Sequence, residues 1–253
     1  MHLNKQKYDL IFGIGEACSC TQSLRKYDLQ FASFPFDWLF GTNFIGRCQI
    51  LAQRFNRFIE KKDLQDTQRR NSDKNNPCEV YYNTYNDITF NHDFFITQKF
   101  DVLYPIVKEK YDRRIARLLS KIETSKQILI VFLETPTTNH PIIDDKTIKK
   151  GYDIIAKAFP KTMIDMLYIQ NSKDINKTEL LTPHIKKIVL PYKCLIDGAV
   201  DYAVDVDKLE CVFQNYQLNL SRTFLLKRKL QKILIKLIPI KQKRRQLRKK
   251  YHL

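Results

Sequence analysis

The chain has 253 residues, of which 43% are hydrophobic and 28% are charged. This length and apolar content suffice for one large packed domain, and they exclude a wholly disordered chain. The sequence has no run of about 18 or more apolar residues, so we expect no membrane-spanning helix. Six cysteines are too few for a disulfide scaffold, and the charged start "MHLNKQKYDL" lacks the apolar part of a signal peptide. We therefore expect reduced thiols in a cytosol.

The net charge of +17 is concentrated at one end of the chain. Residues 222–253 contain 13 Lys and Arg and no acidic residue, so the remainder has 31 basic and 27 acidic residues, a net charge of only +4. The sequence therefore predicts a nearly balanced α/β domain at 1–221 and a basic tail at 222–253.

Runs rich in Ile, Val and Leu predict buried strands, and helical patterns lie between them. The predicted strands are residues 8–14, 127–134, 162–170 and 186–192. The predicted helices are residues 23–27, 43–62, 104–123 and 144–160. Polar residues at 61–77 predict an exposed loop, and 79–95 predicts a β-hairpin or meander with Asn and Asp at its turn. The alternation predicts an α/β fold: a mainly parallel sheet with flanking helices in a single domain.

The first predicted strand runs into "LIFGIGEACSC", where glycines precede a helix that begins near residues 16–18. Unpaired N–H groups at a helix start favour a thiolate, and open α/β sheets place their sites beyond the carboxyl ends of strands. Both arguments favour Cys18 as a nucleophile. Cys20 fits less well, because it lies further into the first turn and can point toward the sheet. The alternative is that both cysteines are small buried packing residues.

Known metal and phosphate motifs are absent from this corner of the sequence. Cys-x-Cys lacks the loop of common zinc sites, and no second cysteine pair lies nearby. "GIGEAC" lacks the third glycine of a dinucleotide fingerprint, and no Walker lysine follows. We therefore expect neither a metal nor a cofactor.

Two further stretches contain residue types that complement a nucleophilic cysteine. In "SFPFDWLFG" the single tryptophan of the chain, Trp38, follows Asp37, and in "FNHDFF" His92 precedes Asp93. A nucleophilic thiol needs a nearby imidazole, and the imidazole needs a carboxylate or amide that fixes its tautomer. Adjacent residues on a strand point to opposite faces, so Asp37 is favoured over Asp93 as the group that orients His92. Alternatively, Asp37 caps a turn, Trp38 belongs to the core and His92 is structural.

The order Gly-x-x-Cys after a strand, then Pro-Phe-Asp-Trp, then His-Asp resembles a bacterial family described as putative papain-like cysteine peptidases, a domain of unknown function. "KYDRRIARLL" followed by "ILIVFLE" also resembles that family's Arg-rich helix and next strand, so the resemblance covers residues 8 to about 200. It implies that Cys18 is the nucleophile and His92 the base, with Asp37 or Asp93 as orienting group. The alternating pattern is closer to a flavodoxin-like or esterase-like sheet, so ester hydrolysis or acyl transfer is as plausible as peptide cleavage.

The tail reads as a basic amphipathic helix followed by a polybasic cluster. Its apolar residues recur at helical spacing: Leu226, Leu230, Ile233, Leu234, Leu237 and Ile238. Pro239 ends or kinks the helix, and the cluster beyond it includes Lys243, Arg244 and Arg245. Such a pattern is typical of binding to an anionic membrane surface, whereas an apolar face makes nucleic acid an unlikely partner. The alternative is a terminal helix packed on the domain.

The ending "IPIK" with its basic residues resembles that of many bacterial enzymes of lipopolysaccharide and capsule assembly. This resemblance implies a peripheral protein at the cytoplasmic face of the inner membrane, with lipid-linked glycans or glycan-assembly enzymes as partners. The leading hypothesis is a Cys-dependent hydrolase or transferase; the first alternative is a non-catalytic accessory or scaffold protein. A glycosyltransferase is the other alternative, because Asp205 and Asp207 spell Asp-x-Asp, although Asp207 with Glu210 also fits a helix cap.

Overall fold

The computed structural model describes residues 5–16, 18–71, 77–134, 143–172, 175–194, 200–204, 206–240, 243–244 and 247. The strands are β1 (Gln6–Tyr8), β2 (Leu10–Gly13), β3 (Leu39–Gly41), β4 (Leu64–Arg70), β5 (Cys78–Asn83), β6 (Ile88–Phe95), β7 (Gln127–Leu133), β8 (Met163–Ser172), β9 (Lys177–Thr182), β10 (Ile185–Cys194), β11 (Val200–Val204) and β12 (Tyr216–Leu218). The helices are α1 (Ser19–Lys26), α2 (Phe44–Ala52), the 3-10 helix η1 (Lys61–Asp63), α3 (Phe100–Thr124), α4 (Asp145–Ala158), α5 (Val206–Phe213) and α6 (Arg222–Lys236).

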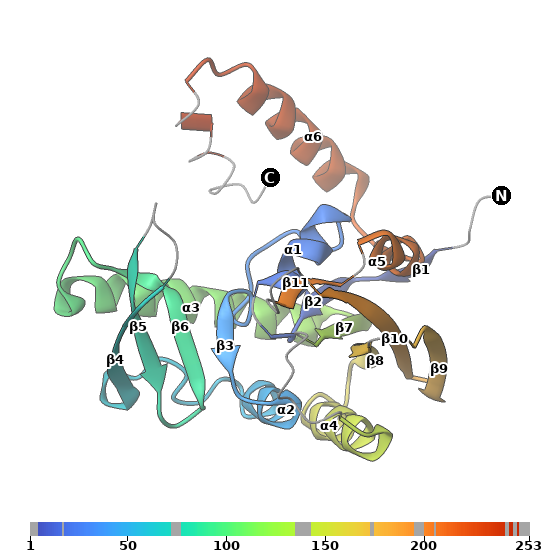
Figure 1. The fold of residues 1–253 in the computed structure, drawn as a ribbon. Coiled ribbons are helices and arrows are strands. Elements are labelled where there is room, and N and C mark those ends of the chain that lie inside the picture. Colours follow the sequence, from blue (N-terminus) through green and yellow to red (C-terminus); the bar gives the residue numbers. More distant parts are fainter. Residues whose placement is uncertain are drawn as a thin grey trace.

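Four parallel strands form the centre of the larger sheet, whose order is β11-β10-β8-β7-β2, with β9 paired to β10 (Figure 1). β2, β7, β8 and β10 are the four buried strands that the sequence predicted, and their parallel pairing is confirmed. The prediction of a mainly parallel fold is nevertheless wrong for the molecule as a whole. β9 and β11 pair antiparallel with β10, and a second sheet, β3-β6-β5-β4, is antiparallel throughout. The fold is therefore mixed α/β.

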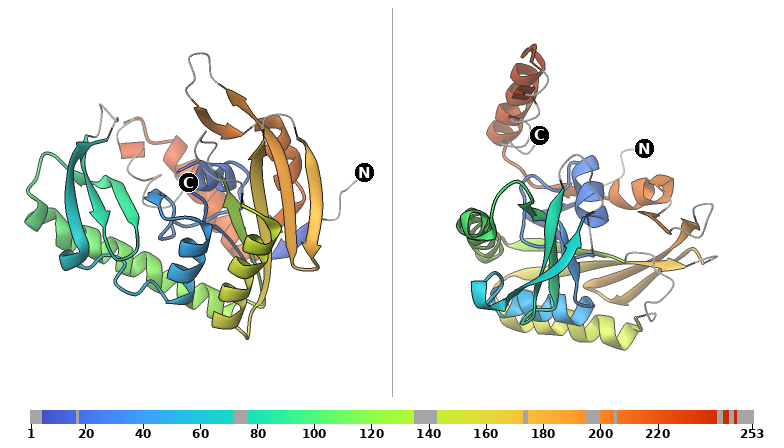
Figure 2. Two further views of the ribbon diagram at one scale, coloured as in Figure 1. Left: turned by 60° about the horizontal axis from the view of Figure 1, so that its bottom comes forward. Right: turned by 60° about the vertical axis from the view of Figure 1, so that its left-hand side comes forward.

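Helices cover both faces of the central sheet, as Figures 1 and 2 show. Side chains on β7 alternate between two cores, as the period of a strand requires. Ile128, Ile130 and Phe132 pack toward α2 and α4, together with the aromatic residues of the second sheet. Leu129, Val131 and Leu133 pack toward α1 and α5. Because the first core continues into the antiparallel sheet, the two sheets share one hydrophobic interior.

The predicted helix at 43–62 is shorter than expected. Asn43 caps α2 by accepting from the Gly46 N–H at 2.9 Å, which confirms the start. After Ala52 the helix ends in a Schellman-type turn, in which the Phe55 N–H donates to the Ile50 carbonyl at 2.9 Å. Phe55 then packs on Phe36, with ring centroids 5.2 Å apart. Burial of aromatic rings in the shared core thus ends a helix whose sequence pattern would allow it to continue.

The segment at 61–77 is also more regular than the predicted loop. Residues 61–63 form η1, and residues 64–70 form β4 at the edge of the antiparallel sheet. All β4 side chains are exposed or half-buried, and most of them are polar, as is typical of an edge strand. The hairpin predicted at 79–95 is confirmed as β5 and β6. At its turn the Asn83 side chain accepts from the Tyr85 and Asn86 N–H groups, and Asp87 has a positive φ.

Helix α6 projects away from the rest of the molecule (Figures 1 and 2). The predicted helix is confirmed at Arg222–Lys236, and the Ser221 hydroxyl caps it by accepting from the Phe224 N–H. The base of α6 contacts the domain through the rings of Phe224 and Phe31, 5.7 Å apart. Ile238, the last residue of the predicted apolar face, is half-buried. The other five side chains are exposed, with these fractions of their surface accessible: Leu226 60%, Leu230 52%, Ile233 46%, Leu234 62% and Leu237 74%. The expectation of an incompletely covered face is confirmed.

We predict that Gly13→Ala destabilises the fold by about 1–3 kcal/mol, because overpacking a core carries such a cost. A Cβ atom at Gly13 would lie 2.6 Å from the Cys20 Sγ atom. Cys20→Ala removes that sulfur, so the same glycine substitution should cost at least about 1 kcal/mol less in the Cys20→Ala background. Urea unfolding of the four proteins in this double-mutant cycle measures the coupling. Additive losses would contradict the close contact between β2 and α1.

Candidate functional site

A glycine corner joins β2 to α1 at the carboxyl edge of the central sheet. The Ile14 N–H donates to the Val131 carbonyl at 2.9 Å and extends the pairing of β2 with β7 by one residue. At Gly15 a Cβ atom would lie 2.9 Å from both the N and O atoms of Leu133, so only glycine fits this approach. The chain then leaves the sheet and enters α1 at the edge where open α/β sheets place their sites.

Cys18 occupies the N-cap position of α1, and its carbonyl accepts the first helical hydrogen bond from the Gln22 N–H at 2.9 Å. Its side chain is half-buried. The sequence predicted a readily ionised thiol at this position, but the structure gives the opposite direction: burial raises the pKa of Cys18 above its usual value. Cys18 lies at the helix start, as expected. At neutral pH its side chain is a neutral thiol and not the expected thiolate.

Cys20 is a packing residue, in agreement with the alternative that the sequence left open. It is fully buried, and its thiol donates to the Val131 carbonyl at 3.6 Å. Burial raises the pKa of Cys20 to about 12, so this thiol does not ionise at neutral pH. Its sulfur lies against Gly13, which holds α1 close to β2.

Asp37 is fully buried at the centre of a polar network. Its carboxylate accepts from Thr21 at 3.0 Å, from the Arg25 guanidinium at 2.9 Å, from the Gln30 amide at 3.0 Å and from the Phe34 N–H at 3.0 Å. Burial raises the pKa of Asp37, while Arg25 and the other donors oppose that rise. Among the hydrogen bonds of the described residues, none joins Asp37 to His92. Asp37 therefore has the alternative role that the sequence left open: its carboxylate caps a turn by accepting from the Phe34 N–H.

Trp38 links this network to His92. The Arg25 guanidinium carbon lies 5.8 Å from the centre of the Trp38 ring, and the His92 ring packs edge-on against that ring at 6.3 Å. Trp38 is half-buried, so it is not an ordinary core residue. On α1, Cys18 and Arg25 are seven residues apart and therefore lie on the same face of the helix. Among the contacts of the described residues, none joins Cys18 directly to His92; Arg25 and Trp38 form the link between α1 and His92.

His92 lies in the middle of a wide bulge in β6. Tyr81 on β5 pairs with Phe90, but Glu79 pairs with Phe94, so the single residue between them faces residues 91–93. A bulge of this kind redirects a side chain and is over-represented next to active sites. The His92 side chain is accordingly exposed, between the half-buried Asn91 and the buried Asp93.

Asn71 holds this bulge in place, and no sequence pattern identified it. Its side-chain oxygen accepts from the Cys78 N–H at 3.0 Å, and its amide nitrogen donates to the Asn91 carbonyl at 2.8 Å. The same nitrogen lies 3.5 Å from the His92 Nδ1 atom. If Nδ1 accepts from this amide, the ring proton resides on Nε2. The side chain that contacts the imidazole is therefore an amide and not a carboxylate.

Asp93 points to the opposite face of β6 from His92, as the strand geometry predicted. It is buried, accepts from the Tyr111 hydroxyl at 2.8 Å and forms an ion pair with Lys110. Asp93 therefore anchors α3 to the antiparallel sheet. It does not serve as an orienting group for His92.

The remaining predictions from sequence concern metals, the Asp-x-Asp pattern and the tail. Within the described ranges, no group of three or more His, Cys, Asp or Glu side chains is placed to hold a metal ion. Asp205 and Arg245 lie outside the described residues. α5 begins at Val206, so Asp207 lies inside this helix and the predicted cap at Asp207 is wrong. No helix in the described part of the chain has the length and apolarity needed to cross a bilayer.

We predict that Asn71→Ala releases the bulge and changes the tautomer of His92. The Cys78 N–H and the Asn91 carbonyl would lose their partner, which should cost about 1–3 kcal/mol of unfolding free energy. Asn91→Ala is the matched control, because it keeps the carbonyl that Asn71 binds. Urea unfolding measures the stability, and the nitrogen chemical shifts of the His92 ring report its tautomer. Identical ring shifts in the wild type and Asn71→Ala would contradict this contact.

Comparison with known proteins supports the resemblance that the sequence motifs carry. The family described as "Putative papain-like cysteine peptidase (DUF1796)" matches residues 9–158. "Uncharacterized protein R408" of Acanthamoeba polyphaga mimivirus is 28% identical over 138 residues, which cover 48% of this chain and 60% of that protein. The chain thus spans less than two thirds of that relative, and no solved structure matches. Because the family match covers more than half of the sequence, the chain belongs to the DUF1796 family of putative papain-like cysteine peptidases.

Proposed function

We propose that this protein is a cysteine-dependent hydrolase or acyl transferase in which Cys18 is the nucleophile and His92 the base. The observation that carries the proposal is the position of Cys18 inside the family match. It caps α1 at the carboxyl edge of the parallel sheet, on the helix face that leads through Arg25 and Trp38 to His92. A helix start also offers backbone N–H groups to an oxyanion that forms during acyl transfer.

The raised pKa of Cys18 shapes the mechanism. A neutral thiol is a weak nucleophile, so His92 has to accept the thiol proton as sulfur attacks the acyl carbon. The imidazolium then returns the proton to the leaving alcohol or amine, and a thioester to Cys18 remains. Water or a second acceptor attacks that thioester with His92 again as base, which releases the acyl group and restores the thiol. For the first step, the His92 nitrogen that takes the thiol proton must be unprotonated. A hydrogen bond from the Asn71 amide to Nδ1 would leave the ring proton on Nε2, so His92 acts as a base at Nε2 only when Asn71 releases Nδ1 and the ring proton resides there.

The structure also offers an observation that favours the rival hypothesis, a non-catalytic accessory protein. Asp37, which the sequence favoured as the third catalytic group, serves the Arg25 and Thr21 network instead. A half-buried thiol with a raised pKa is also compatible with packing alone. The two hypotheses differ in whether His92 influences the chemistry of Cys18.

We further propose that α6 and the tail bind an anionic membrane surface. The exposed residues of the apolar face support this, because burying them in the interface is favourable. Each of the 13 basic residues near such a surface adds about 1 kcal/mol. A cytoplasmic, inner-membrane location and a role in lipopolysaccharide or capsule metabolism, with lipid-linked glycans or glycan-assembly enzymes as partners, are proposals that rest on the resemblance of the tail alone.

We predict that His92→Ala slows the alkylation of Cys18 several-fold near pH 7 and has no effect at high pH. The pKa of Cys18 lies above the usual value of 9.0, so its thiolate is scarce at neutral pH and a base accelerates the reaction. Above that pKa the thiolate forms without help, and the two proteins should react alike. Iodoacetamide labelling with peptide mass spectrometry measures the rate for each cysteine.

His184→Ala is the matched control for this experiment. His184 is also exposed, but it pairs with Asp165 at the other end of the parallel strands. Cys211 is exposed and gives an internal reference for thiol reactivity. Equal Cys18 rates in the wild type, His92→Ala and His184→Ala at every pH would contradict the catalytic pair and favour the accessory protein.

We predict that removing residues 222–253 lowers affinity for anionic vesicles at least tenfold while the domain stays folded, since the tail contacts it mainly at the base of α6. In the full-length protein, changing Lys243, Arg244 and Arg245 to Glu should reduce the salt-sensitive part of binding. Changing Leu234 and Leu237 to Asp should remove the part that persists at high salt. Vesicle flotation at rising salt concentration measures both.

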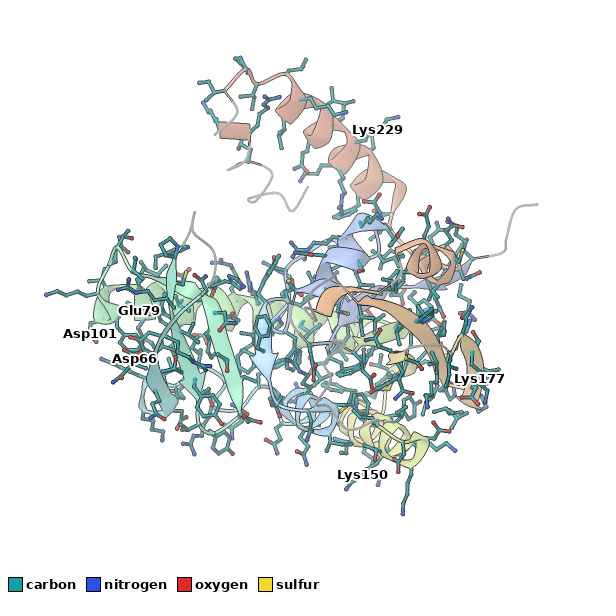
Figure 3. The ribbon with its side chains drawn as sticks, in the orientation of Figure 1. Asp66, Glu79, Asp101, Lys150, Lys177 and Lys229 are labelled. Carbon is teal, nitrogen blue, oxygen red and sulfur yellow. The ribbon has the colours of Figure 1, made fainter. Side chains whose placement is uncertain are left out.

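Changing Lys146, Lys149 and Lys150 to Glu is the matched control for the tail. These lysines are exposed on α4, and Figure 3 shows Lys150 at the opposite side of the molecule from Lys229 on α6. The control alters net charge as much as the tail triple variant does, but it should leave a larger share of binding intact. Equal flotation of full-length and truncated protein would show that the tail has no membrane role.

A further inference from the structure

Two arginines on α3 lie close to the buried Asp37 without forming an ion pair. Arg117 donates to the Ser33 carbonyl at 3.0 Å, four residues before Asp37. Arg114 lies three residues earlier on the same face of α3, with its guanidinium carbon 5.3 Å from the centre of the Tyr111 ring. The two guanidinium groups are therefore neighbours, and both are half-buried.

The charges around these arginines do not balance. Asp37 pairs with Arg25, and Asp93 pairs with Lys110. Among the described residues, neither Arg114 nor Arg117 forms an ion pair with a carboxylate. Arg113 lies one helical turn before Arg117 on α3, but its side chain is exposed and pairs with Glu109. Thus the exposed Arg113 has a carboxylate partner, whereas the half-buried Arg114 and Arg117 form no ion pair with a described carboxylate.

This arrangement is electrostatically unfavourable in the isolated chain. Burial lowers the pKa of Arg117, the nearby charges of Arg113 and Arg114 lower it further, and the negative charge of Asp37 opposes this shift. Two adjacent, partly buried cations repel one another, and the single negative charge of Asp37, which already pairs with Arg25, offsets them only in part. An anion bound between the two guanidinium groups would remove both costs. The protein therefore presents two preorganised cations whose missing partner carries negative charge.

We propose that Arg114 and Arg117 bind a phosphate group of the substrate. Guanidinium groups present planar pairs of N–H donors that match phosphate oxygens, and two positive charges suit a group that carries close to two negative charges. Arg117 uses one of its five N–H donors on Ser33, so donors remain for a ligand. The substrate class is thus a phosphate ester.

The position of this site connects it to Cys18. Thr21 donates to the same Asp37 carboxylate, and Thr21 lies one helical turn beyond Cys18 on α1. Arg117 donates to the Ser33 carbonyl, and Arg25 donates to the Ser33 hydroxyl at 2.9 Å and lies over the Trp38 ring. A phosphate held by Arg114 and Arg117 would therefore lie near Arg25 and Trp38. This assignment of a substrate class rests on the proposed function, because it assumes that the molecule bound here is the one on which Cys18 acts.

The full-length protein and inorganic phosphate provide the test. Thermal unfolding is followed as phosphate replaces chloride at constant ionic strength, for the wild type, Arg114→Gln, Arg117→Gln and the matched control Arg54→Gln, which changes an exposed arginine that pairs with Glu123. Phosphate should raise the melting temperature of the wild type and of Arg54→Gln. Arg114→Gln should bind phosphate at least tenfold more weakly, as measured by phosphorus NMR, although without phosphate it melts no lower than the wild type.

Two outcomes would overturn the proposal. Equal phosphate stabilisation of all four proteins would show that the effect is not located at Arg114 and Arg117. A melting temperature of Arg114→Gln that is well below that of the wild type without phosphate, together with an undiminished response to phosphate, would assign Arg114 a structural role.

Two further probes distinguish the source of the phosphate. Vesicles that contain phosphatidic acid present a phosphate monoester, and vesicles that contain phosphatidylglycerol present a diester at the same membrane. If the ligand is a lipid headgroup, Arg114→Gln should lose affinity for the first and keep affinity for the second. If the ligand is a soluble phosphate ester, Arg114→Gln should bind both kinds of vesicle as the wild type does. Glucose 1-phosphate should then raise the melting temperature only of proteins that retain both Arg114 and Arg117.

Alkylation of Cys18 in the same variants separates this proposal from the proposed function. Arg114→Gln should leave the effect of His92 on the Cys18 rate unchanged. If phosphate binding fails while His92 still accelerates the reaction, the phosphate site is wrong and the nucleophile stands. If phosphate binds as described but His92 has no influence, the anion site stands and the catalytic pair is wrong.

Discussion

Arg47 is fully buried, and its guanidinium donates to backbone carbonyl groups from both sheets. Its Nη1 atom donates to the carbonyl of Gly15, just after β2, at 2.8 Å. Its Nη2 atom donates to two carbonyl groups of β3, those of Leu39 at 3.1 Å and Gly41 at 2.9 Å. Burial lowers the pKa of Arg47 to about 10, so the group remains charged at neutral pH. Its removal would leave several buried carbonyl groups without a donor, and each such loss costs about 1–3 kcal/mol. The junction between the parallel and antiparallel sheets depends on this side chain.

The same contact fixes the geometry of the candidate site. With its carbonyl held by Arg47, the Gly15 peptide has one orientation, and the following residues leave the sheet in the direction that places Cys18 at the start of α1. The partner sheet contributes His92 through a bulge that Asn71 stabilises. Each half of the proposed catalytic pair thus belongs to a different sheet. Their mutual position depends on the Arg47 junction and on the Asp37 network, which ties α1 to the loop before β3.

The sequence predicted correctly those elements whose structure follows from the spacing of apolar and polar residues along the chain. The four central strands are continuous apolar runs, α6 has a regular apolar stripe, and Asp93 faces away from His92 because strand neighbours alternate. Arg47, Asn71 and the end of α2 were missed because their roles come from partners far apart in sequence. A buried arginine or an asparagine that fills a bulge has no periodic signature. The raised pKa of Cys18 was missed for a related reason, since a helix start predicts the opposite direction and only three-dimensional burial reverses it.

Burial and a backbone hydrogen bond act in opposite directions on the pKa of Cys18. Burial disfavours the thiolate, whereas a backbone hydrogen bond favours it. In the resting protein the pKa of Cys18 is above its usual value, so the first effect dominates. A bound anionic substrate would repel a thiolate and make it still less favourable. Such a site would therefore transfer the proton to His92 as the sulfur–carbon bond forms, as a serine–histidine pair does, without a preformed thiolate–imidazolium ion pair.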